Sequence, residues 1–204
     1  LTQAVDLDPK NLRGREILGT ILSSKEKDKA RKMLESVVAD DPHRPVAVRA
    51  LGMLAMERKD YDDAAKWFLQ LESLRPLDDA SHTNLAGIYL VKKENARAIT
   101  ELKELEQHEQ RDDRIPRRLA ELYVQRQDYS DAQDAAYRAL RINPYDAVDQ
   151  ELMAQVLMAR KEPAQAAVYW HYATELQPQL ATRWEGLADA QGAAGDTAAA
   201  AAAA

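Results

Sequence analysis

The side chains that could carry acid–base or metal chemistry are few in this sequence. It contains four histidines and no cysteine, and it has no HExxH pair, glycine-rich phosphate loop or nucleophile elbow. His171 and Glu175 lie four residues apart, a spacing that two metal ligands on one helix can use. No third ligand accompanies them, so we interpret them as a solvated pair. His82 stands among polar residues at the start of a predicted helix and is predicted to be exposed. We therefore expect no catalytic residue, no metal and no cofactor.

Composition and charge narrow the classes of partner. The 204 residues are 46% hydrophobic and 30% charged, which fits one or two compact domains or one elongated array. The net charge is -6 with both signs interspersed, so a generic nucleic-acid binder, which normally shows a basic face, is disfavoured. No apolar run approaches the ~18 residues of a membrane span. The lack of cysteine fits both the cytoplasm and the periplasm, so the compartment stays open.

The elements that position all these side chains repeat along the chain. "KDYDDAAKWF" (59–68) is followed 68 residues later by "QDYSDAQDAAY" (127–137). Alanine recurs every 34 residues, at Ala30, Ala64, Ala98, Ala132, Ala166 and Ala200. A bulky aliphatic residue keeps the same step, at Ile17, Leu51, Leu85, Leu119, Met153 and Leu187. Such a period indicates an array of small units that bury their apolar faces against one another.

Residues 113–146 illustrate one repeat as a pair of helices. Leu119, Leu122 and Tyr123 fall at helical spacing and predict an apolar stripe on the first helix. The polar "RQDYSD" predicts a turn with an acidic cap for the second helix, whose small face is Ala132, Ala136 and Ala139. The closing "NP" ends that helix, because proline has no N–H group.

This pattern resembles the tetratricopeptide repeat family. "ALGMLAMERKDYDDAAKWFLQLESLRP" (50–76) and "WEGLADAQGAAGD" (184–196) match its signature of Trp or Leu, Gly, Tyr, Ala, Phe, Ala and Pro. The resemblance implies an all-α, right-handed superhelical solenoid of antiparallel helix pairs with a concave groove. The predicted organisation is the end of a truncated repeat at 1–10, repeats at 11–44, 45–78, 79–112, 113–146 and 147–180, and an incomplete sixth at 181–204 with an alanine tail.

The predicted repeats depart from the family pattern at a few positions. Gln110 stands where a closing proline is expected, and "LEQHEQRDDR" surrounds it. We therefore expect the second helix of the 79–112 repeat to run on. Leu71 and Leu105 fill positions where the family prefers a small residue.

The first helices are expected to line the groove, so equivalent positions form rows along it. One row is Arg15, Arg49, Thr83, Arg117, Glu151 and Glu185. The next row is Gly19, Met53, Gly87, Glu121, Gln155 and Asp189. The rows predict a groove that is basic toward its N-terminal half and acidic toward its C-terminal half. Such a groove suits a bipolar peptide or a mixed protein surface.

Part of the groove resembles the repeat triplets that bind the C-terminal carboxylates of chaperones. The corresponding residues are Arg49, Met53, Asn84, Arg114 and Arg118. The resemblance implies charge-assisted bonds from the arginines and the amide to a terminal carboxylate. Met53 departs from the family, which has an amide there. The alternative interpretation is that these arginines only make the groove soluble.

The aromatic residues divide into a core set and a surface set. Phe68, Tyr123 and Trp170 are predicted to be core. Tyr169, His171 and Tyr172 are predicted to point away from Trp170. They are interpreted as packing on a neighbouring repeat, with a second contact patch as the alternative.

These features favour a non-catalytic scaffold that binds a peptide segment or a protein surface in the groove. The alternatives are an accessory repeat segment of a longer enzyme, such as a peptidase or glycosyltransferase, and a self-association module. Both ends of the sequence are interpreted as truncated, because "LTQAVDLDPK" begins inside a helix pattern and the chain ends in alanines.

Overall fold

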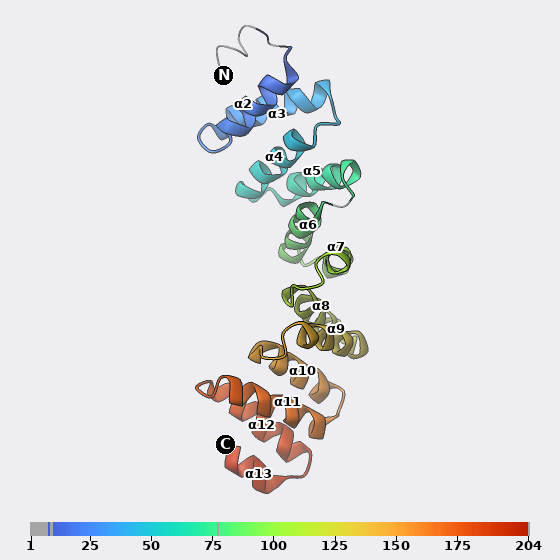
Figure 1. The fold of residues 1–204 in the computed structure, drawn as a ribbon, viewed down its shortest axis with the longest axis vertical. Coiled ribbons are helices and arrows are strands. Elements are labelled where there is room, and N and C mark those ends of the chain that lie inside the picture. Colours follow the sequence, from blue (N-terminus) through green and yellow to red (C-terminus); the bar gives the residue numbers. More distant parts are fainter. Residues whose placement is uncertain (1–7, 9, 77, 204) are drawn as a thin grey trace. The chain divides into compact units, whose positions relative to one another are not determined.

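The computed structural model describes residues 8, 10–76 and 78–203. Within them the chain is all-helical, as predicted (Figure 1). Contacts divide it into two compact units, Leu1–Glu101 (unit 1) and Leu102–Ala204 (unit 2), and α7 begins in the first and ends in the second. The helices before this division are α2 (Leu12–Leu22), α3 (Lys27–Asp40), α4 (Pro45–Glu57), α5 (Tyr61–Leu74), α6 (Asp79–Val91) and α7 (Asn95–His108). Those after it are α8 (Arg114–Gln125), α9 (Tyr129–Ile142), α10 (Ala147–Ala159), α11 (Pro163–Leu176), α12 (Ala181–Ala193) and α13 (Thr197–Ala203).

The helix bounds keep the 34-residue period of the sequence. We call α2, α4, α6, α8, α10 and α12 the first helices, and α3, α5, α7, α9, α11 and α13 the second helices. The second helices α3 to α11 each have 14 residues and begin at positions 27, 61, 95, 129 and 163. Within each unit, consecutive helices pack on one another, for example α4 on α5 and α10 on α11.

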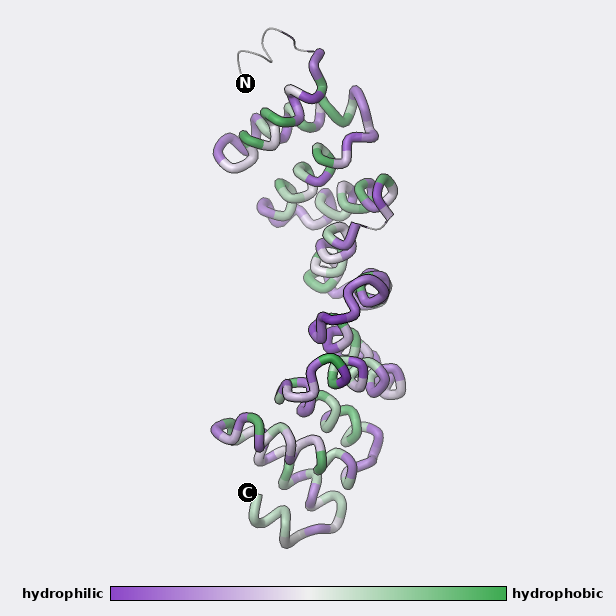
Figure 2. Tube along the Cα trace, viewed as in Figure 1, coloured by the Kyte–Doolittle hydropathy of each residue, from purple (hydrophilic) through white to green (hydrophobic). Residues whose placement is uncertain are grey.

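The expectation that the second helix of the 79–112 repeat runs on is wrong. α7 ends at His108 and is no longer than α5 or α9. Residues 109–113, "EQRDD", form the turn after it, and Figure 2 shows α7 and this turn in the colours of hydrophilic residues. A run of charged and amide side chains ends the helix here without a proline, because it has no apolar residue to pack.

The turn between the two helices of each pair uses one backbone geometry. A residue with positive φ recurs every 34 residues, at Lys59, Lys93, Gln127, Lys161 and Gly195. At Gln127, for example, the amides of Gln127 and Asp128 donate to the carbonyls of Val124 and Tyr123, both at 2.9 Å. This is the Schellman motif, and an acidic residue follows each left-handed position and precedes the second helix.

Replacing Lys161 by glycine is expected to raise the free energy of unfolding by about 0.5–1 kcal/mol. The φ of 64° at Lys161 is unfavourable for an L-residue but not for glycine, and Gly195 already stands at the equivalent position. Chemical denaturation checks the shift. Gln155→Gly in the exposed middle of α10 is the control and is expected to destabilise by about 1 kcal/mol. If both variants changed the free energy of unfolding in the same direction, the assigned turn geometry would be contradicted.

The closing turns of the repeats also share a contact. After three closing prolines, the residue six positions later approaches that proline's carbonyl: His82 Nε2 at 3.3 Å from Pro76 O, Gln150 Nε2 at 2.8 Å from Pro144 O and Trp184 Nε1 at 2.9 Å from Pro178 O. After Pro42 the equivalent residue is Val48, and Gln70 donates to the Pro42 carbonyl instead. At the turn of Gln110 the equivalent residue is Pro116, which has no donor.

The repeated alanines are the close-contact positions of the core. Ala30, Ala64, Ala98, Ala132 and Ala166 are fully buried, as predicted for the last four. The aliphatic row is also buried, except for Ile17, which is exposed. In α2 the buried positions are instead Glu16, Leu18 and Gly19, and the Glu16 carboxylate accepts from Arg44 and from the Ala47 amide.

Replacing Ala132 by leucine is expected to cost about 1–3 kcal/mol of stability, because α9 packs on α8 and α10 with no room at this side chain. The thermal midpoint of the full chain measures the effect. Asp134→Leu on the exposed side of the same helix is the control. A neutral Ala132→Leu would contradict this packing register.

Candidate functional site: the face of the first helices

The first helices of unit 1 frame a cleft that contains two of the predicted binding residues. It lies between α2 and α4 and has a volume of about 280 Å³. Its lining residues are Thr20, Ser23, Val46, Arg49, Ala50, Met53, Leu54 and Glu57. Met53 is 47% exposed and Val46 is also exposed, so the cleft offers apolar surface to a ligand. Met53, which departs from the carboxylate-binding pattern, gives this part of the groove an apolar character.

The arginines of the predicted basic row bind acidic residues of their own unit. Arg15 donates to Asp40 at 2.5 Å. Arg49 donates to Asp78 at 2.5 Å, and Asp78 also caps α6 by accepting from the Ser81 amide. Arg117 donates in the same way to Asp146, the cap of α10, 29 residues further on. Arg49 and Arg117 thus connect one repeat to the next and are not free cations.

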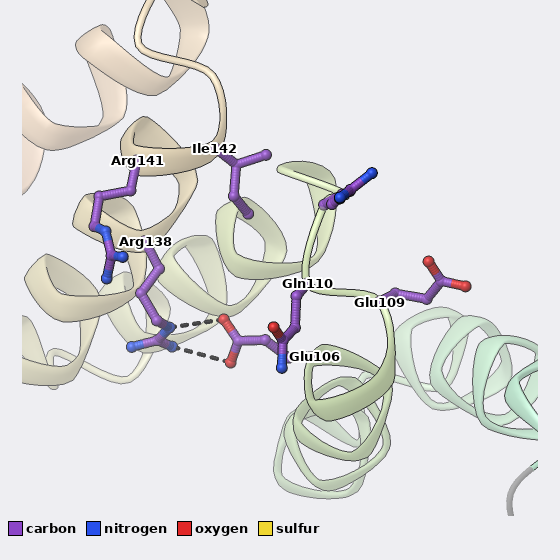
Figure 3. Close-up of a pocket in the computed structure, with 7 residues that line it drawn as sticks. Glu106, Glu109, Gln110, Arg138, Arg141 and Ile142 are labelled. Atoms are coloured by element: carbon purple, nitrogen blue, oxygen red, sulfur yellow. Dashed lines mark hydrogen bonds and ion pairs between the residues drawn. The ribbon is translucent and has the colours of Figure 1, made fainter.

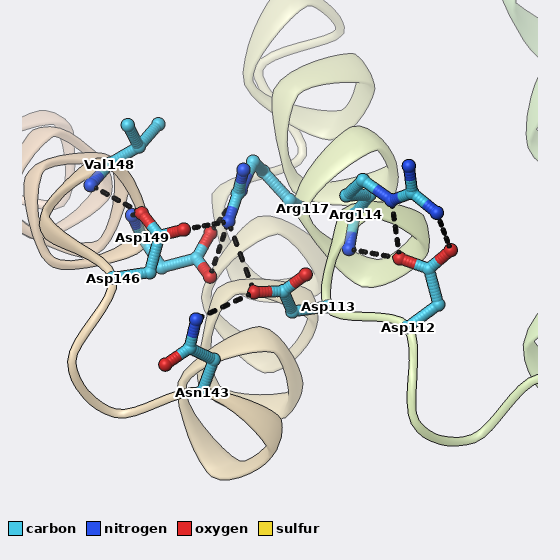
Figure 4. A network of polar contacts seen from close by, with 8 residues as sticks. All are labelled: Asp112, Asp113, Arg114, Arg117, Asn143, Asp146, Val148 and Asp149. Carbon is cyan, nitrogen blue, oxygen red and sulfur yellow. Dashed lines mark hydrogen bonds and ion pairs between the residues drawn. The ribbon is translucent and has the colours of Figure 1, made fainter.

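Arg117 is the centre of the polar network in Figure 4. Its Nε donates to Asp149 Oδ1 at 2.5 Å, and its Nη2 donates to Asp146 at 2.6 Å and to Asp113 at 3.3 Å. Asn143 Nδ2 donates at 3.2 Å to the same Asp113 oxygen that accepts from Arg117. Three carboxylates therefore surround one guanidinium group between α8, α9 and α10.

Burial and charge act in opposite directions in this network. Asp149 is 0% exposed. Its burial raises its pKa, and the hydrogen bond and charge of Arg117 oppose that rise without cancelling it. The hydrogen bond to Asp149 is in turn the main cause of the raised pKa of Arg117. The network keeps a buried carboxylate neutralised, which is a structural task.

The other residues of the carboxylate-binding resemblance are also engaged locally. Asn84 donates its side-chain amide to the Ala80 carbonyl of its own helix at 2.6 Å. Arg114 binds Asp112 through two side-chain bonds of 2.8 and 2.7 Å, and this hydrogen bonding is the main cause of the lowered pKa of Asp112. A ligand carboxylate would have to displace these contacts.

Arg118 and Glu121 are likewise paired on α8. Arg118 donates to Glu121 at 2.5 Å, and both side chains are partly exposed. An exposed pair one helical turn apart is worth little free energy, so it can open to a ligand more readily than the Arg117 network. Arg118 is therefore more available to a ligand than Arg117.

The acidic residues at the C-terminal end of the row differ from the arginines. Glu151 accepts from the buried Arg183 at 3.0 Å and from Gln155 at 3.1 Å. Glu185 and Asp189 are exposed, and within the described part of the chain neither has a hydrogen-bond or ion-pair partner. The charges that stand unpaired in the two rows are therefore acidic and lie on α12.

His82 is not exposed, so the prediction from its polar neighbours is wrong. It is 3% exposed on α6, with Nδ1 2.8 Å from Glu101 Oε2 of α7. Burial lowers the pKa of His82, but the bonds to Glu101 and the Pro76 carbonyl and the charges of Glu101 and Glu72 raise it more, so the net direction is up. The signal that sequence reasoning missed is the repeat itself, since the equivalent Val48 is a core position.

A further cleft in unit 2 lies at the unusual turn after α7 (Figure 3). Its volume is about 570 Å³, and its lining residues are Glu106, Glu109, Gln110, Arg111, Arg138, Arg141 and Ile142. Arg138 crosses it to bind both oxygens of Glu106, at 2.7 and 3.2 Å. This cleft lies between the ends of second helices and contains none of the predicted groove residues.

The aromatic core was predicted correctly, and His171 and Tyr172 are exposed beside the buried Trp170. Phe68, Tyr123 and Trp170 are buried. Tyr172 is exposed and lines a cleft with Pro144 and Tyr145 of the preceding repeat and with Gln150, Glu175 and Leu176. His171 and Glu175 are an exposed pair at 3.4 Å, as interpreted from the sequence. Among the described residues, no helix has both the length and the apolar character needed to cross a membrane.

Comparison with known proteins agrees with the repeat architecture. Residues 22–88 match the family model described as tetratricopeptide repeat. No curated protein matches the chain.

Several solved structures share the fold at low identity. A crystal structure of the MamA protein has a TM-score of 0.71 at 16% identity, over 78% of this chain and 87% of that one. YrrB, described as a TPR protein with an unusual peptide-binding site, has a TM-score of 0.70 at 12% identity, over 83% of this chain and 88% of that one. The Pseudomonas aeruginosa pilF structure has a TM-score of 0.61 at 18% identity, over 94% of this chain and 88% of that one. The match over residues 22–88 and this shared fold support a tetratricopeptide repeat assignment for the chain.

Proposed function

We propose that this protein is a non-catalytic scaffold that binds a peptide segment of another protein along the face of its first helices. The cleft between α2 and α4 is the observation that carries the proposal, because it presents Val46 and Met53 to solvent beside Arg49. Exposed apolar side chains in a preformed cleft favour an extended or helical segment with an apolar anchor. YrrB, which shares the fold, is itself described as having a peptide-binding site.

The rigidity of the helix pairs supports the same proposal. Arg49 fixes α4 to the cap of α6 in unit 1, and Arg117 fixes α8 to the cap of α10 in unit 2, so these parts of the face are ordered before a ligand arrives. A preformed face lowers the entropy cost of docking. In unit 1 the ligand chemistry that fits is an apolar anchor for the cleft. In unit 2, taken by itself, the unpaired Glu185 and Asp189 on α12 fit a basic stretch.

Selection from a random peptide library, followed by calorimetry on the selected peptides, tests the proposal. Met53→Glu is expected to weaken binding by more than about tenfold, since it places a charge in the apolar cleft. Leu69→Glu is the matched control, because Leu69 is an equally exposed apolar residue on the second helix α5. Equal losses in the two variants, or no selected peptide at all, would count against this site.

The carboxylate-binding interpretation of Arg49, Asn84, Arg114 and Arg118 is tested on the same peptides. If it holds, amidating the peptide C-terminus and reversing Arg114 and Arg118 to glutamate each weaken binding, and the loss is smaller at high salt. If neither change alters the affinity, these arginines only make the face soluble. The local pairs of Arg114 and Arg118 give that second outcome a structural basis.

Self-association is a second candidate function. The exposed Tyr145, Tyr172 and Leu176 gather at one cleft of unit 2, and exposed aromatic residues are enriched in protein interfaces. The molar mass of the full chain at two concentrations tests it, with Tyr172→Glu as the disrupting variant. A mass that stays monomeric at both concentrations would rule out this function.

A further inference from the structure

The cleft at the turn after α7 has a counterpart one repeat further along unit 2. Several of its lining positions recur 34 residues later in the lining of the cleft that contains Tyr172. The corresponding pairs are Gln110 and Pro144, Arg111 and Tyr145, Arg138 and Tyr172, Arg141 and Glu175, and Ile142 and Leu176. Both clefts therefore form where the end of a second helix lies beside the turn that closes the preceding repeat.

The two clefts share a position in the repeat but differ in chemistry. The first has arginine at three positions where the second has two tyrosines and a glutamate. Two repeats before the first cleft, the same positions hold His43, Gln70 and Ser73. The repeat fold does not require arginine at any of these positions. The three arginines, Arg111, Arg138 and Arg141, are thus specific to this cleft.

Two of these arginines are free cations. Arg111 and Arg141 are exposed, and within the described part of the chain neither has a hydrogen-bond or ion-pair partner. Arg138 differs, because it binds both oxygens of Glu106. Figure 3 shows the other acid of the cleft, Glu109, pointing away from Arg138 and Arg141. The cleft therefore offers two uncompensated positive charges on a chain whose net charge is -6.

Helix stability explains only one of these two charges. Arg141 lies in the last turn of α9, where a cation offsets the partial negative charge of the helix end. Arg111 lies in the turn of residues 109–113, outside any helix, and gains nothing from this effect. An anionic ligand accounts for both arginines, because they line one cleft of about 570 Å³ and bring guanidinium donors to it from two different elements.

We propose that this cleft binds an acidic segment of a partner protein, with carboxylates of that segment accepting hydrogen bonds from Arg111 and Arg141. Guanidinium groups bind carboxylates through charge-assisted hydrogen bonds, which are stronger than neutral ones. The pair of Arg138 and Glu106 beside them is already neutral, so the attraction comes from the two unpaired arginines.

The surroundings of the arginines favour a polypeptide over a nucleic acid. Ile142 adds an apolar side chain to the cleft. The equivalent cleft one repeat further on presents the exposed Tyr145 and Tyr172, so a segment that continues along unit 2 meets aromatic surface. A nucleic acid would favour a broad basic face, which this acidic chain does not offer. The site belongs to the second helices of unit 2, whereas the cleft between α2 and α4 belongs to the first helices of unit 1.

Parallel selections from a random peptide library, on the full chain and on its double variant Arg111→Gln and Arg141→Gln, test the proposal. We expect peptides rich in Asp and Glu, with aromatic residues beside them, from the unsubstituted chain and not from the double variant. In calorimetry the double variant is expected to bind such a peptide at least about tenfold more weakly, and the affinity of the unsubstituted chain should fall as salt rises. Exchanging the acids of the peptide for amides should weaken binding in the same way. Glutamine places no anion at the end of α9, so the helical circular dichroism spectrum should not change.

Two variants outside the cleft are the controls. Arg13→Gln removes another exposed arginine that has no partner within the described residues, and Met53→Glu alters the cleft between α2 and α4. Both are expected to leave the affinity for the acidic peptide unchanged, which separates a failure of this site from a failure of the first-helix site.

Three results would overturn the proposal. The first is a selection without acidic peptides, or acidic peptides that bind the double variant as tightly as the unsubstituted chain. The second is displacement of the peptide by an equal concentration of inorganic phosphate or single-stranded DNA, which would assign the cleft to phosphate groups. The third is a molar mass that rises with concentration in the unsubstituted chain and not in the double variant, which would make a second copy of the chain the occupant.

Discussion

Replacing Arg117 by methionine is expected to lower the free energy of unfolding of unit 2 by about 3–5 kcal/mol. Asp149 is 0% exposed and receives two hydrogen bonds from this guanidinium group, so the variant leaves a buried carboxylate without its cation. Methionine keeps much of the side-chain volume, so the loss reports mainly the charge. Urea denaturation measures the total effect, and hydrogen exchange locates it in α8 to α10.

Arg118→Met is the matched control for this prediction. Arg118 is the next residue on the same helix and pairs with Glu121 at a partly exposed site, so its loss is expected to cost under about 1 kcal/mol. The carboxyl pKa of Asp149 is expected to rise further in Arg117→Met, because burial then acts without opposition. A raised folded-state pKa means that the folded chain holds this proton more tightly than the unfolded chain. The variant should therefore regain stability as pH falls from neutral toward the raised pKa. Similar losses of unfolding free energy for Arg117→Met and Arg118→Met would show that the Arg117 network does not stabilise unit 2 as described.

The sequence predicted the helix pairs because their determinants are local and repeated. The alanine step located the second helices, and the polar turns located their starts, so α5, α9 and α11 agree with the 34-residue step. The sequence did not predict the end of α7, because the missing proline was interpreted as a sign that the helix continues. A helix also needs apolar residues to pack, and "EQRDD" has none.

The sequence predicted where the charged residues of the first-helix face lie, but not that most of them are paired with other charged residues. The sequence shows which side chains share the face, whereas their partners lie 29 or 32 residues away, as in Arg117 with Asp146 and Asp149. A row of arginines therefore suggests a basic groove, whereas Arg49 and Arg117 in fact bind acids of the next repeat and Arg15 binds an acid of its own. His82 shows the same limit, since its partner Glu101 lies 19 residues further on.

Replacing Phe68 by alanine is expected to lower the free energy of unfolding of unit 1 by about 3–5 kcal/mol. Its ring is 0% exposed and belongs to α5, which packs on α4 and α6, so truncation leaves a cavity between helices. Leu69→Ala is the control. The adjacent Leu69 is 45% exposed, so its truncation removes an apolar side chain without leaving a buried cavity. Chemical denaturation followed by Trp67 and by circular dichroism measures both variants.

Gly52 provides a sharper test of the same contact. A Cβ atom at Gly52 would lie 3.0 Å from the Phe68 ring, so Gly52→Ala is expected to destabilise the unsubstituted protein by forcing the ring to move. In the Phe68→Ala background the ring is gone, and the same change is expected to stabilise α4 by up to about 1 kcal/mol, since alanine favours a helix over glycine. The sign of the Gly52→Ala effect should thus reverse between the two backgrounds in a double-mutant cycle. Additive effects would mean that the ring and the glycine are not in contact, and that the small residue at this position of the repeat serves something other than close helix packing.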